Sequence, residues 1–216
     1  MKSPKTGFIF SRFEDWEPYY LRILGHFGFD RARDEEAARL LGGLLTRDDL
    51  PLLREHVRGK PATVCGNGPN LPDELDRILG MVIAADGAAN RLFARGIRPA
   101  AIVTDLDGAT DAFIAMNRAG TVIVVHAHGD NMPLLRKWVP LFPGPLVGTT
   151  QSRPFDGIHN FGGFSDGDRA VFLAHALGAT EVALAGFDID DPAVGPVKRG
   201  KLLFARELLR LAGHDL

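Results

Sequence analysis

Short apolar stretches, each followed by an acidic or glycine-rich segment that can open a helix, recur through most of this chain. The five stretches span residues 62–65, 81–85, 101–103, 121–125 and 181–185. Continuous apolar runs are typical of strands covered on both faces, and alternating strands and helices predict a mostly parallel sheet. In an open sheet of this kind, ligands bind beyond the carboxyl ends of the strands. The polar segments are therefore expected to meet at one edge and form a site.

The intervening segments carry helical patterns. We expect these helices at about 72–79, 88–95, 109–118, 131–139, 166–177 and 200–212. The predicted fold class is α/β, with a mostly parallel, doubly wound (Rossmann-like) sheet and a small N-terminal helical segment. We place that segment at residues 1–59 and the α/β catalytic domain at 60–216.

The N-terminal segment is predicted to hold three helices. Apolar residues from Trp16 to Phe27 recur at helical spacing and are expected to pack on the larger domain. Asp34 is expected to cap the second helix. Thr46 and Asp49 resemble a capping box that opens the third.

Composition excludes several classes of protein. The 216 residues carry a formal net charge of −2, and the sequence shows neither a basic footprint for nucleic acid nor a membrane-spanning stretch. The single cysteine, Cys65, fits a reducing compartment and a buried place in a strand. We expect a soluble cytoplasmic protein that takes small-molecule substrates and is compatible with a homo-oligomer.

The segment Thr104-Asp105-Leu106-Asp107-Gly108 carries the strongest local signal. Two carboxylates two residues apart can hold one hydrated Mg²⁺, which binds one or two carboxylates together with phosphates. The alternative is a helix cap at Asp107 with Asp105 merely exposed.

Two earlier strand ends offer further candidates. Gly66, Asn67 and Gly68 could hold an anionic group through backbone amides, and Asp86 follows 20 residues after Gly66, as in dinucleotide folds. A nicotinamide site is disfavoured because Leu71 stands where the third glycine would be. A tight turn at the glycines and a helix cap at Asp86 are the alternatives.

A pair of histidines closes the next strand. His126 and His128 precede Asp130, and a zinc site is disfavoured because the sequence brings no cysteine or third histidine nearby. We expect the histidines to contact phosphate or orient substrate, with Asp130 as a further metal or substrate ligand.

Two later segments could approach a nucleotide. Gly162 and Gly163 precede Asp166 at a helix start, where capping by Ser165 and Asp168 is the alternative explanation. The stretch 190–200, with Lys198 and the following Lys201, could form a lid over ATP phosphates, although a solvated loop is the simpler interpretation.

Five motifs in order resemble those of the archaeal 6-hydroxymethyl-7,8-dihydropterin pyrophosphokinases, and the segment 16–20 resembles theirs as well. The motifs are Gly-Asn-Gly-Pro-Asn-Leu (66–71), Ala-Asp-Gly-Ala (85–88), Thr-Asp-Leu-Asp-Gly (104–108), His-Ala-His-Gly-Asp-Asn (126–131) and Gly-Gly-Phe-Ser-Asp-Gly-Asp-Arg-Ala (162–170). The core is also similar to thiamine pyrophosphokinase, but the histidine motif departs from that family and favours the pterin.

The resemblance implies transfer of diphosphate from ATP to the hydroxymethyl group of the dihydropterin, with release of AMP, in tetrahydromethanopterin or folate-type biosynthesis. It implies that Asp105 and Asp107 hold Mg²⁺, with Asp86, Asp130 or Asp166 completing the shell. Thiamine pyrophosphokinase is the alternative activity. A nucleotide-sugar glycosyltransferase with a D-x-D motif and a non-catalytic ATP sensor are further alternatives.

Overall fold

The computed structural model describes residues 10–216, so the first nine residues of the predicted helical segment lie outside it. Its centre is a seven-stranded sheet in which every pair of neighbours is parallel, in the order β6-β5-β4-β3-β2-β1-β7. The strands are β1 (Pro61–Cys65), β2 (Met81–Ala85), β3 (Ala101–Thr104), β4 (Val122–Ala127), β5 (Leu146–Thr150), β6 (Ile158–His159) and β7 (Glu181–Ala185). The predicted α/β class with a parallel sheet is confirmed.

Two strands were not predicted from the sequence. Only Leu146 and Val147 in β5 are large and apolar, because Gly148, Thr149 and Thr150 complete the strand. The two-residue β6 is an edge strand too short to show any pattern. No helix separates β5 from β6, so the strand–helix alternation that revealed the other strands is missing here.

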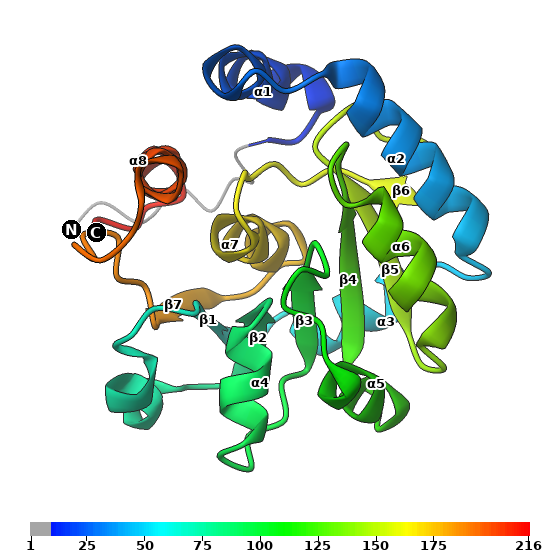
Figure 1. The fold of residues 1–216 in the computed structure, drawn as a ribbon. Coiled ribbons are helices and arrows are strands. Elements are labelled where there is room, and N and C mark those ends of the chain that lie inside the picture. The colour runs from blue at the N-terminus through cyan, green and yellow to red at the C-terminus, as the bar shows by residue number, and fades with distance from the viewer. Residues whose placement is uncertain (1–9) are drawn as a thin grey trace.

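Helices cover both faces of the sheet (Figure 1). On one face α2 (Arg31–Leu44), α4 (Ala88–Phe93), α5 (Asp111–Arg118) and α6 (Met132–Trp138) enclose a core that includes Leu41, Leu92 and Phe113. On the other face α3 (Leu50–Val57), α7 (Asp166–Ala176) and α8 (Pro196–Leu211) enclose a second core. The doubly wound arrangement thus buries the strands on both sides, as their continuous apolar runs predict.

Two predicted helices differ from the structure. The segment expected at 72–79 is a 3₁₀ helix, η1 (Leu71–Arg77), and a second 3₁₀ turn, η2 (Val139–Leu141), follows α6. The helix expected to begin at Gly200 begins at Pro196, because proline is well suited to the first helical position. Lys198 therefore lies on the first turn of a helix rather than on a loop, and Lys201 follows it on the same helix.

The N-terminal helices pack on the larger domain as expected, and α1 (Phe13–Phe27) does so against α7 and α8. In α1, Trp16 and Tyr20 are fully buried in a cluster that also contains Phe172 of α7. The predicted caps are wrong. Asp30, whose side chain accepts a hydrogen bond from the Ala32 amide, caps α2, and the third helix is preceded by Asp49 without the capping box that Thr46 was expected to form.

Asp34 differs most from its expected role as a cap, because its side chain is buried and has partners in three other parts of the chain.

Within residues 10–216, none of the helices is both long enough and apolar enough to span a bilayer.

Candidate active site

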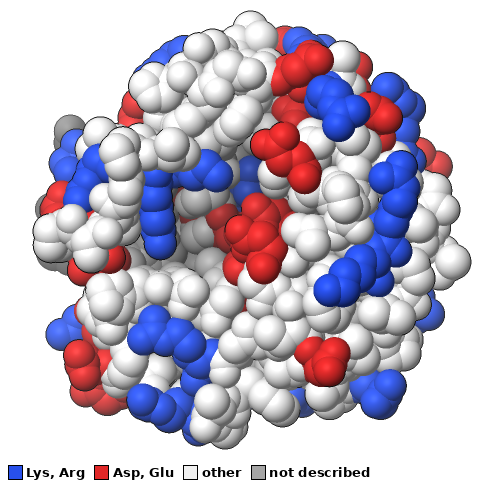
Figure 2. Space-filling model, in the orientation of Figure 1, with Lys and Arg blue, Asp and Glu red and all other residues white. Residues whose placement is uncertain are grey.

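Three carboxylates lie together at the carboxyl edge of the sheet. Asp86 follows β2, whereas Asp105 and Asp107 follow β3, and these two strands are hydrogen-bonded neighbours. Each residue offers a carboxylate oxygen, and all three oxygens lie within 4.8 Å of one another. Figure 2 shows acidic side chains at the centre of this face, beside a hollow. We call these three residues the acid cluster.

The backbone is strained where it builds the acid cluster. Asp86 has a φ of 43° and Leu106 a φ of 74°, a left-handed conformation that disfavours residues other than glycine by about 1 kcal/mol or more. Thr104 holds both turns, because its hydroxyl donates to Asp86 Oδ1 at 2.6 Å and accepts from the Leu106 amide at 2.7 Å. Strain of this kind gathers at functional sites, where the surrounding structure enforces it.

Gly108 leaves the space that the Asp86 carboxylate occupies. A Cβ atom on Gly108 would lie 2.0 Å from Asp86 Oδ2 and 2.8 Å from its Cγ. Asn90 of α4 fixes this loop, since its amide group donates to the Gly108 carbonyl at 3.0 Å and its oxygen accepts from Thr110 at 2.6 Å. Gly108 therefore leaves room for the carboxylate of Asp86, which follows β2, to lie against the loop after β3.

The acid cluster holds a proton at mildly acidic pH. Burial, together with the negative charges of Asp105 and Asp86, raises the pKa of Asp107 from 3.8 to about 6. Burial also acts to raise the pKa of Asp105, but hydrogen bonds from His128 and from the Asp107 amide lower it to about 2. Crowded carboxylates need a proton or a cation for compensation, and three hard oxygen donors suit Mg²⁺. The residues present thus fit a divalent cation.

Asp130, which we expected as a further metal or substrate ligand, is not a member of this group. Its side chain is exposed in the turn after β4, and Asp86 stands in the third place instead. Asp130 follows the histidines closely in the sequence but is not in the cluster, whereas Asp86, 44 positions earlier, is. Because β2 and β4 both pair with β3, the difference arises in the turns that follow these strands.

His128 points at the acid cluster. Its Nε2 lies 3.4 Å from Asp105 Oδ2, and its Nδ1 accepts from the Asp130 amide at 3.4 Å. Asn131 ties the turn to the neighbouring loop, because its amide group donates to the carbonyls of Asp105 (2.8 Å) and His126 (2.7 Å). Because Nδ1 of His128 accepts from the Asp130 amide, Nε2 carries a ring proton that is directed at Asp105 and orients it.

His126 faces the interior instead. It is 2% exposed, and its Nδ1 lies 3.1 Å from Thr149 Oγ1, which itself donates to the Val125 carbonyl. Burial, and next the charge of Arg169, hold its pKa well below the usual range, so the ring is neutral. Its Nε2 has no hydrogen-bond partner among residues 10–216 and lines a small cavity together with Arg169.

The start of α7 brings two more ionisable side chains, Asp166 and Arg169, to the site. The Ser165–Asp168 capping box is confirmed, with the Asp168 carboxylate accepting from the amides of Ser165 and Phe164. Burial and the nearby Asp105 raise the pKa of Asp166 well above its usual range. Arg169, which is 8% exposed, pairs with Asp166 at 3.3 Å. Asp166 lies near the acid cluster but is not one of the three residues that could jointly bind a cation.

The glycines after β1 have a packing role that the sequence did not reveal. Gly66 and Gly68 donate their amides to the carbonyls of Ala185 and Gly186, at 2.8 and 2.7 Å. A Cβ atom on either would lie within 2.6 Å of the Gly186 carbonyl. These amides are therefore not the free anion donors that we expected. Arg91 of α4 donates to the Gly68 carbonyl at 2.7 Å, so this loop is fixed from two sides.

Gly162 and Gly163 also serve packing. Both have left-handed φ values, 81° and 93°, and a Cβ atom would strike the Phe10 ring at the first and the Arg169 backbone at the second. Ligand contacts at Gly162, Gly163, Asn67 and the earlier glycines stay predictions.

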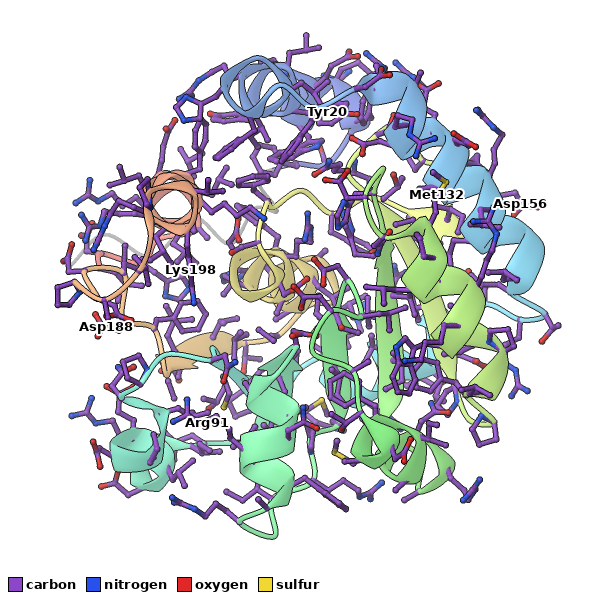
Figure 3. All side chains as sticks on the ribbon, viewed as in Figure 1. Tyr20, Arg91, Met132, Asp156, Asp188 and Lys198 are labelled. Atoms are coloured by element: carbon purple, nitrogen blue, oxygen red, sulfur yellow. The ribbon has the colours of Figure 1, made fainter. Side chains whose placement is uncertain are left out.

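The hollow beside the acid cluster is bordered by basic side chains (Figure 2). Lys198 lies on the first turn of α8 and Arg91 lies on α4, on opposite sides of this region (Figure 3). Lys198 and Lys201 are exposed. Cations on the rim and carboxylates within are a suitable arrangement for a magnesium-bound polyphosphate.

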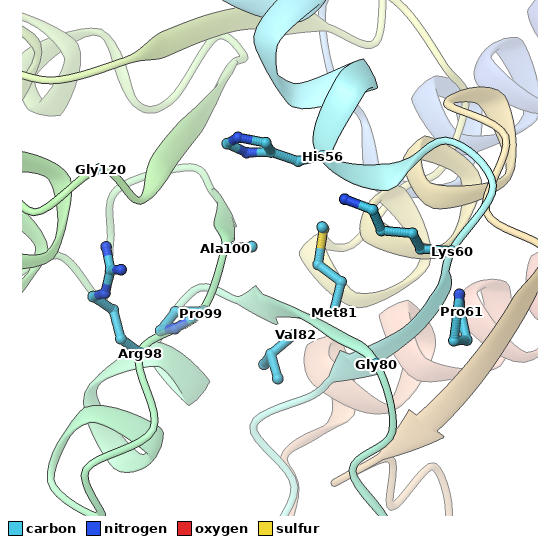
Figure 4. A pocket seen from close by; sticks show the side chains of 10 residues that line it. All are labelled: His56, Lys60, Pro61, Gly80, Met81, Val82, Arg98, Pro99, Ala100 and Gly120. Carbon is cyan, nitrogen blue, oxygen red and sulfur yellow. The ribbon is translucent and has the colours of Figure 1, made fainter.

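A cavity of about 550 Å³ lies at the opposite edge of the sheet (Figure 4). It is lined by His56, Lys60, Met81 and Arg98, near the amino ends of the central strands, and by no acidic residue. Figure 4 shows Arg98 across the cavity from His56 and Lys60, and its guanidinium donates to the Ala119 carbonyl. The acid cluster and His128 lie at the other edge.

Arg169, Thr104, Asn90 and Asn131 were missed as functional residues. All four stand inside or beside the quoted motifs, so their polar side chains at strand ends were an available signal. Gln151 contacts Arg169, and Asp34 contacts the turn after β4. Neither stands in or beside a quoted motif, so no such signal was available for them.

Comparison with known proteins gives consistent matches. A family model described as 6-hydroxymethylpterin diphosphokinase MptE-like matches residues 41–193. A Methanothermobacter thermautotrophicus protein named 6-hydroxymethyl-7,8-dihydropterin pyrophosphokinase is 45% identical over 219 residues, covering 90% of this chain and 92% of its own. Proteins of the same name from Pyrococcus furiosus and Methanocaldococcus jannaschii are 42% and 33% identical, covering 92% and 91% of this chain and 93% of their own.

Among solved structures, a MAF glycosyltransferase from Magnetospirillum magneticum is similar to 72% of this chain, which corresponds to 30% of that protein. The TM-score is 0.47 and the sequence identity is 20%. We draw no functional conclusion from this likeness.

Proposed function

The chain belongs to the family of MptE-like 6-hydroxymethylpterin diphosphokinases, and on that premise we propose that it transfers diphosphate from ATP to 6-hydroxymethyl-7,8-dihydropterin and releases AMP. The observation that carries the proposal is the acid cluster at the carboxyl edge of the sheet. It offers the ligands that a magnesium-bound polyphosphate requires.

In this reaction the hydroxymethyl oxygen forms a bond to the β-phosphorus of ATP, and the bond from that phosphorus to the bridging oxygen of the α-phosphate breaks. The hydroxyl proton is lost and AMP leaves with the bridging oxygen. Phosphoryl transfer of this kind depends mainly on positioning and on neutralising phosphate charge. The site residues are assigned on those two requirements.

Asp86, Asp105 and Asp107 would hold Mg²⁺, which when bound neutralises charge on the phosphate oxygens. Thr104 and Asn90 keep the two acidic loops in place, and His128 orients Asp105 through its Nε2–H. Lys198 and Lys201, on the first turns of α8, are proposed to contact the phosphates that extend into the hollow.

The remaining expected residues keep more general roles. Gly66, Asn67, Gly68, Gly162 and Gly163 shape the loops on which the nucleotide rests. His126, Asp130 and Asp166 are proposed to border the substrates, without a direct bond to the metal. The division between residues 1–59 and 60–216 stays a prediction.

The test is AMP release from ATP and Mg²⁺, with 6-hydroxymethyl-7,8-dihydropterin or thiamine as acceptor. AMP with the pterin alone supports the proposal, whereas AMP with thiamine alone would assign the other diphosphokinase activity. ATP binding without AMP from either acceptor would contradict both and favour a sugar transferase or a sensor.

A matched pair of variants ties the activity to the site. Asp105→Asn removes one charge from the acid cluster and is expected to abolish most AMP release. Asp156→Asn makes the same change at an exposed position in the loop before β6, away from the hollow, and is expected to behave as the unmodified protein (Figure 3).

A further inference from the structure

A buried aspartate in the N-terminal helices connects them to the site. Asp34 of α2 is 3% exposed, and its two carboxylate oxygens accept three hydrogen bonds. Oδ1 accepts from the Gly129 amide at 2.8 Å, and Oδ2 accepts from Tyr20 Oη and Gln151 Nε2, each at 2.8 Å. A buried carboxylate with all its partners in place is a strongly specified arrangement.

One of these bonds reaches the turn that carries His128. Gly129 lies between His128, whose Nε2 is 3.4 Å from Asp105, and Asp130, whose amide donates to the same ring. The Gly129 amide has Asp34 as its partner, so α2 fixes the turn by which His128 meets the acid cluster.

The second bond reaches Arg169. Gln151 follows β5 and uses both ends of its amide: Nε2 donates to Asp34, and Oε1 accepts from Arg169 Nη2 at 3.4 Å. Trp16 of α1 donates to the Gln151 carbonyl at 2.9 Å and fixes the backbone. Arg169 in turn pairs with Asp166, which lies beside the acid cluster.

We infer that Asp34 and Gln151 are positioning residues for the transfer reaction, through which the N-terminal helices orient Arg169 and the His128 turn at the acid cluster. This inference rests on the proposed function for its kinetic readout. It gives the aromatic N-terminal helices a role in the site beyond packing.

The direction of each hydrogen bond predicts which substitutions at Asp34 and Gln151 leave a donor without an acceptor. Burial raises the pKa of Tyr20, and its hydroxyl donates to Asp34. In Asp34→Asn the remaining oxygen can still accept from Gly129, and Tyr20 can reverse its hydroxyl to accept from the new amide. Gln151 cannot adapt in the same way. If its oxygen turns to the new amide, its own NH₂ group faces Arg169, and two donors then oppose each other.

The second-site variant Gln151→Glu restores an acceptor on both sides. Combined with Asp34→Asn, it accepts from the new amide and from Arg169, and the total charge equals that of the unmodified protein. Alone, Gln151→Glu places a second carboxylate against Asp34 and is expected to be impaired. If Asp34 and Gln151 only filled space, neither single variant would lose activity and the double variant would have nothing to restore, because the two single changes are nearly isosteric.

The experiment compares the two single variants, the double variant and Glu36→Gln, a control that removes one exposed charge from the same helix. Kinetics of AMP release are measured well below every melting temperature, with ATP and the pterin varied separately. Asp34→Asn is expected to lower kcat by about tenfold or more, with both KM values within about threefold. The double variant is expected to recover most of this loss, and Glu36→Gln to lose nothing.

Hydrogen exchange gives a readout independent of activity. Asp34→Asn should speed exchange in residues 163–169 while leaving the Gly129 amide protected, and the double variant should restore the slow exchange. Unchanged kcat in Asp34→Asn, or a double variant no better than the single one, would overturn the inference. If the unmodified protein releases no AMP, the proposed function fails, and the exchange pattern alone decides whether Asp34 and Gln151 position Arg169.

Discussion

Replacing Gly108 by alanine tests the geometry of the acid cluster directly. The new Cβ would lie 2.0 Å from Asp86 Oδ2, so that oxygen must retreat by about 1.4 Å to reach the 3.4 Å of ordinary contact. The φ of Gly108 lies outside the left-handed region, so alanine fits the backbone itself. The atom that must move is the end of a side chain, and we therefore expect the fold to persist.

The expected loss follows from that displacement. A misplacement of about 1 Å in a catalytic group lowers the rate by about 10²-fold, which corresponds to about 2.7 kcal/mol of lost transition-state stabilisation. AMP release is measured at saturating and limiting Mg²⁺, because a displaced Asp86 should also weaken metal binding. Gly43→Ala is the control, since Gly43 is exposed in α2 with open space around its Cβ position.

A double-mutant cycle identifies the cause. In an Asp86→Ala background the clashing carboxylate is gone, so adding Gly108→Ala should reduce activity no further. If Gly108→Ala keeps nearly normal kcat/KM, or if its effect persists unchanged without Asp86, then the close approach of these residues does not matter to the reaction and the reasoning fails.

Four further predictions concern the same chain. Asp105→Asn and Asp107→Asn should each lower kcat by at least about 10²-fold if these carboxylates neutralise transition-state charge through the metal; near-normal turnover in both would contradict the assignment. Because the pKa of Asp107 in the folded protein is raised to about 6, protons compete with Mg²⁺ for this carboxylate. The Mg²⁺ affinity measured by calorimetry should therefore fall by about tenfold for each pH unit below that value. The same raised pKa means that the metal-free protein binds the Asp107 proton more tightly when folded than when unfolded. The contribution of this proton to the free energy of unfolding is therefore full below about pH 4 and is lost as pH rises through about 6. Melting temperatures measured without metal should fall over this pH range in the unmodified protein but not in Asp107→Asn, and the same pH dependence in both would argue against it. Cys65 is fully buried, and burial raises the pKa of its thiol to about 12, so a disulfide reagent should react only after denaturation; rapid reaction with the folded protein would show that β1 opens.

The local order of residues was sufficient to predict much of the fold. Strands such as β1 and β4 are continuous apolar runs followed by a turn and a helix, and this pattern depends only on neighbours along the chain. The same is true of the pair Asp105 and Asp107 and of the Ser165–Asp168 cap. β5 escaped prediction because a glycine and two threonines take up most of the strand.

The third carboxylate required the tertiary structure. Asp86 and Asp130 both follow strands that neighbour β3, one on each side, so sequence order alone could not choose between them. The choice depends on the left-handed turn at Asp86, the hydroxyl of Thr104 and the space at Gly108, all of which direct one side chain inward. Asp130 instead extends into solvent from its turn.

The sequence by itself thus determined which residue types stand at the ends of the five predicted strands, since apolar periodicity and turn residues act over a few positions. The tertiary structure alone decided which of those ends meet, and it brought Asp34 from the N-terminal helices into contact with Gly129 and Gln151, positions 95 and 117 residues away. Hydrogen bonds over such separations leave no periodic trace in the chain, because their geometry exists only after the sheet has ordered its strands.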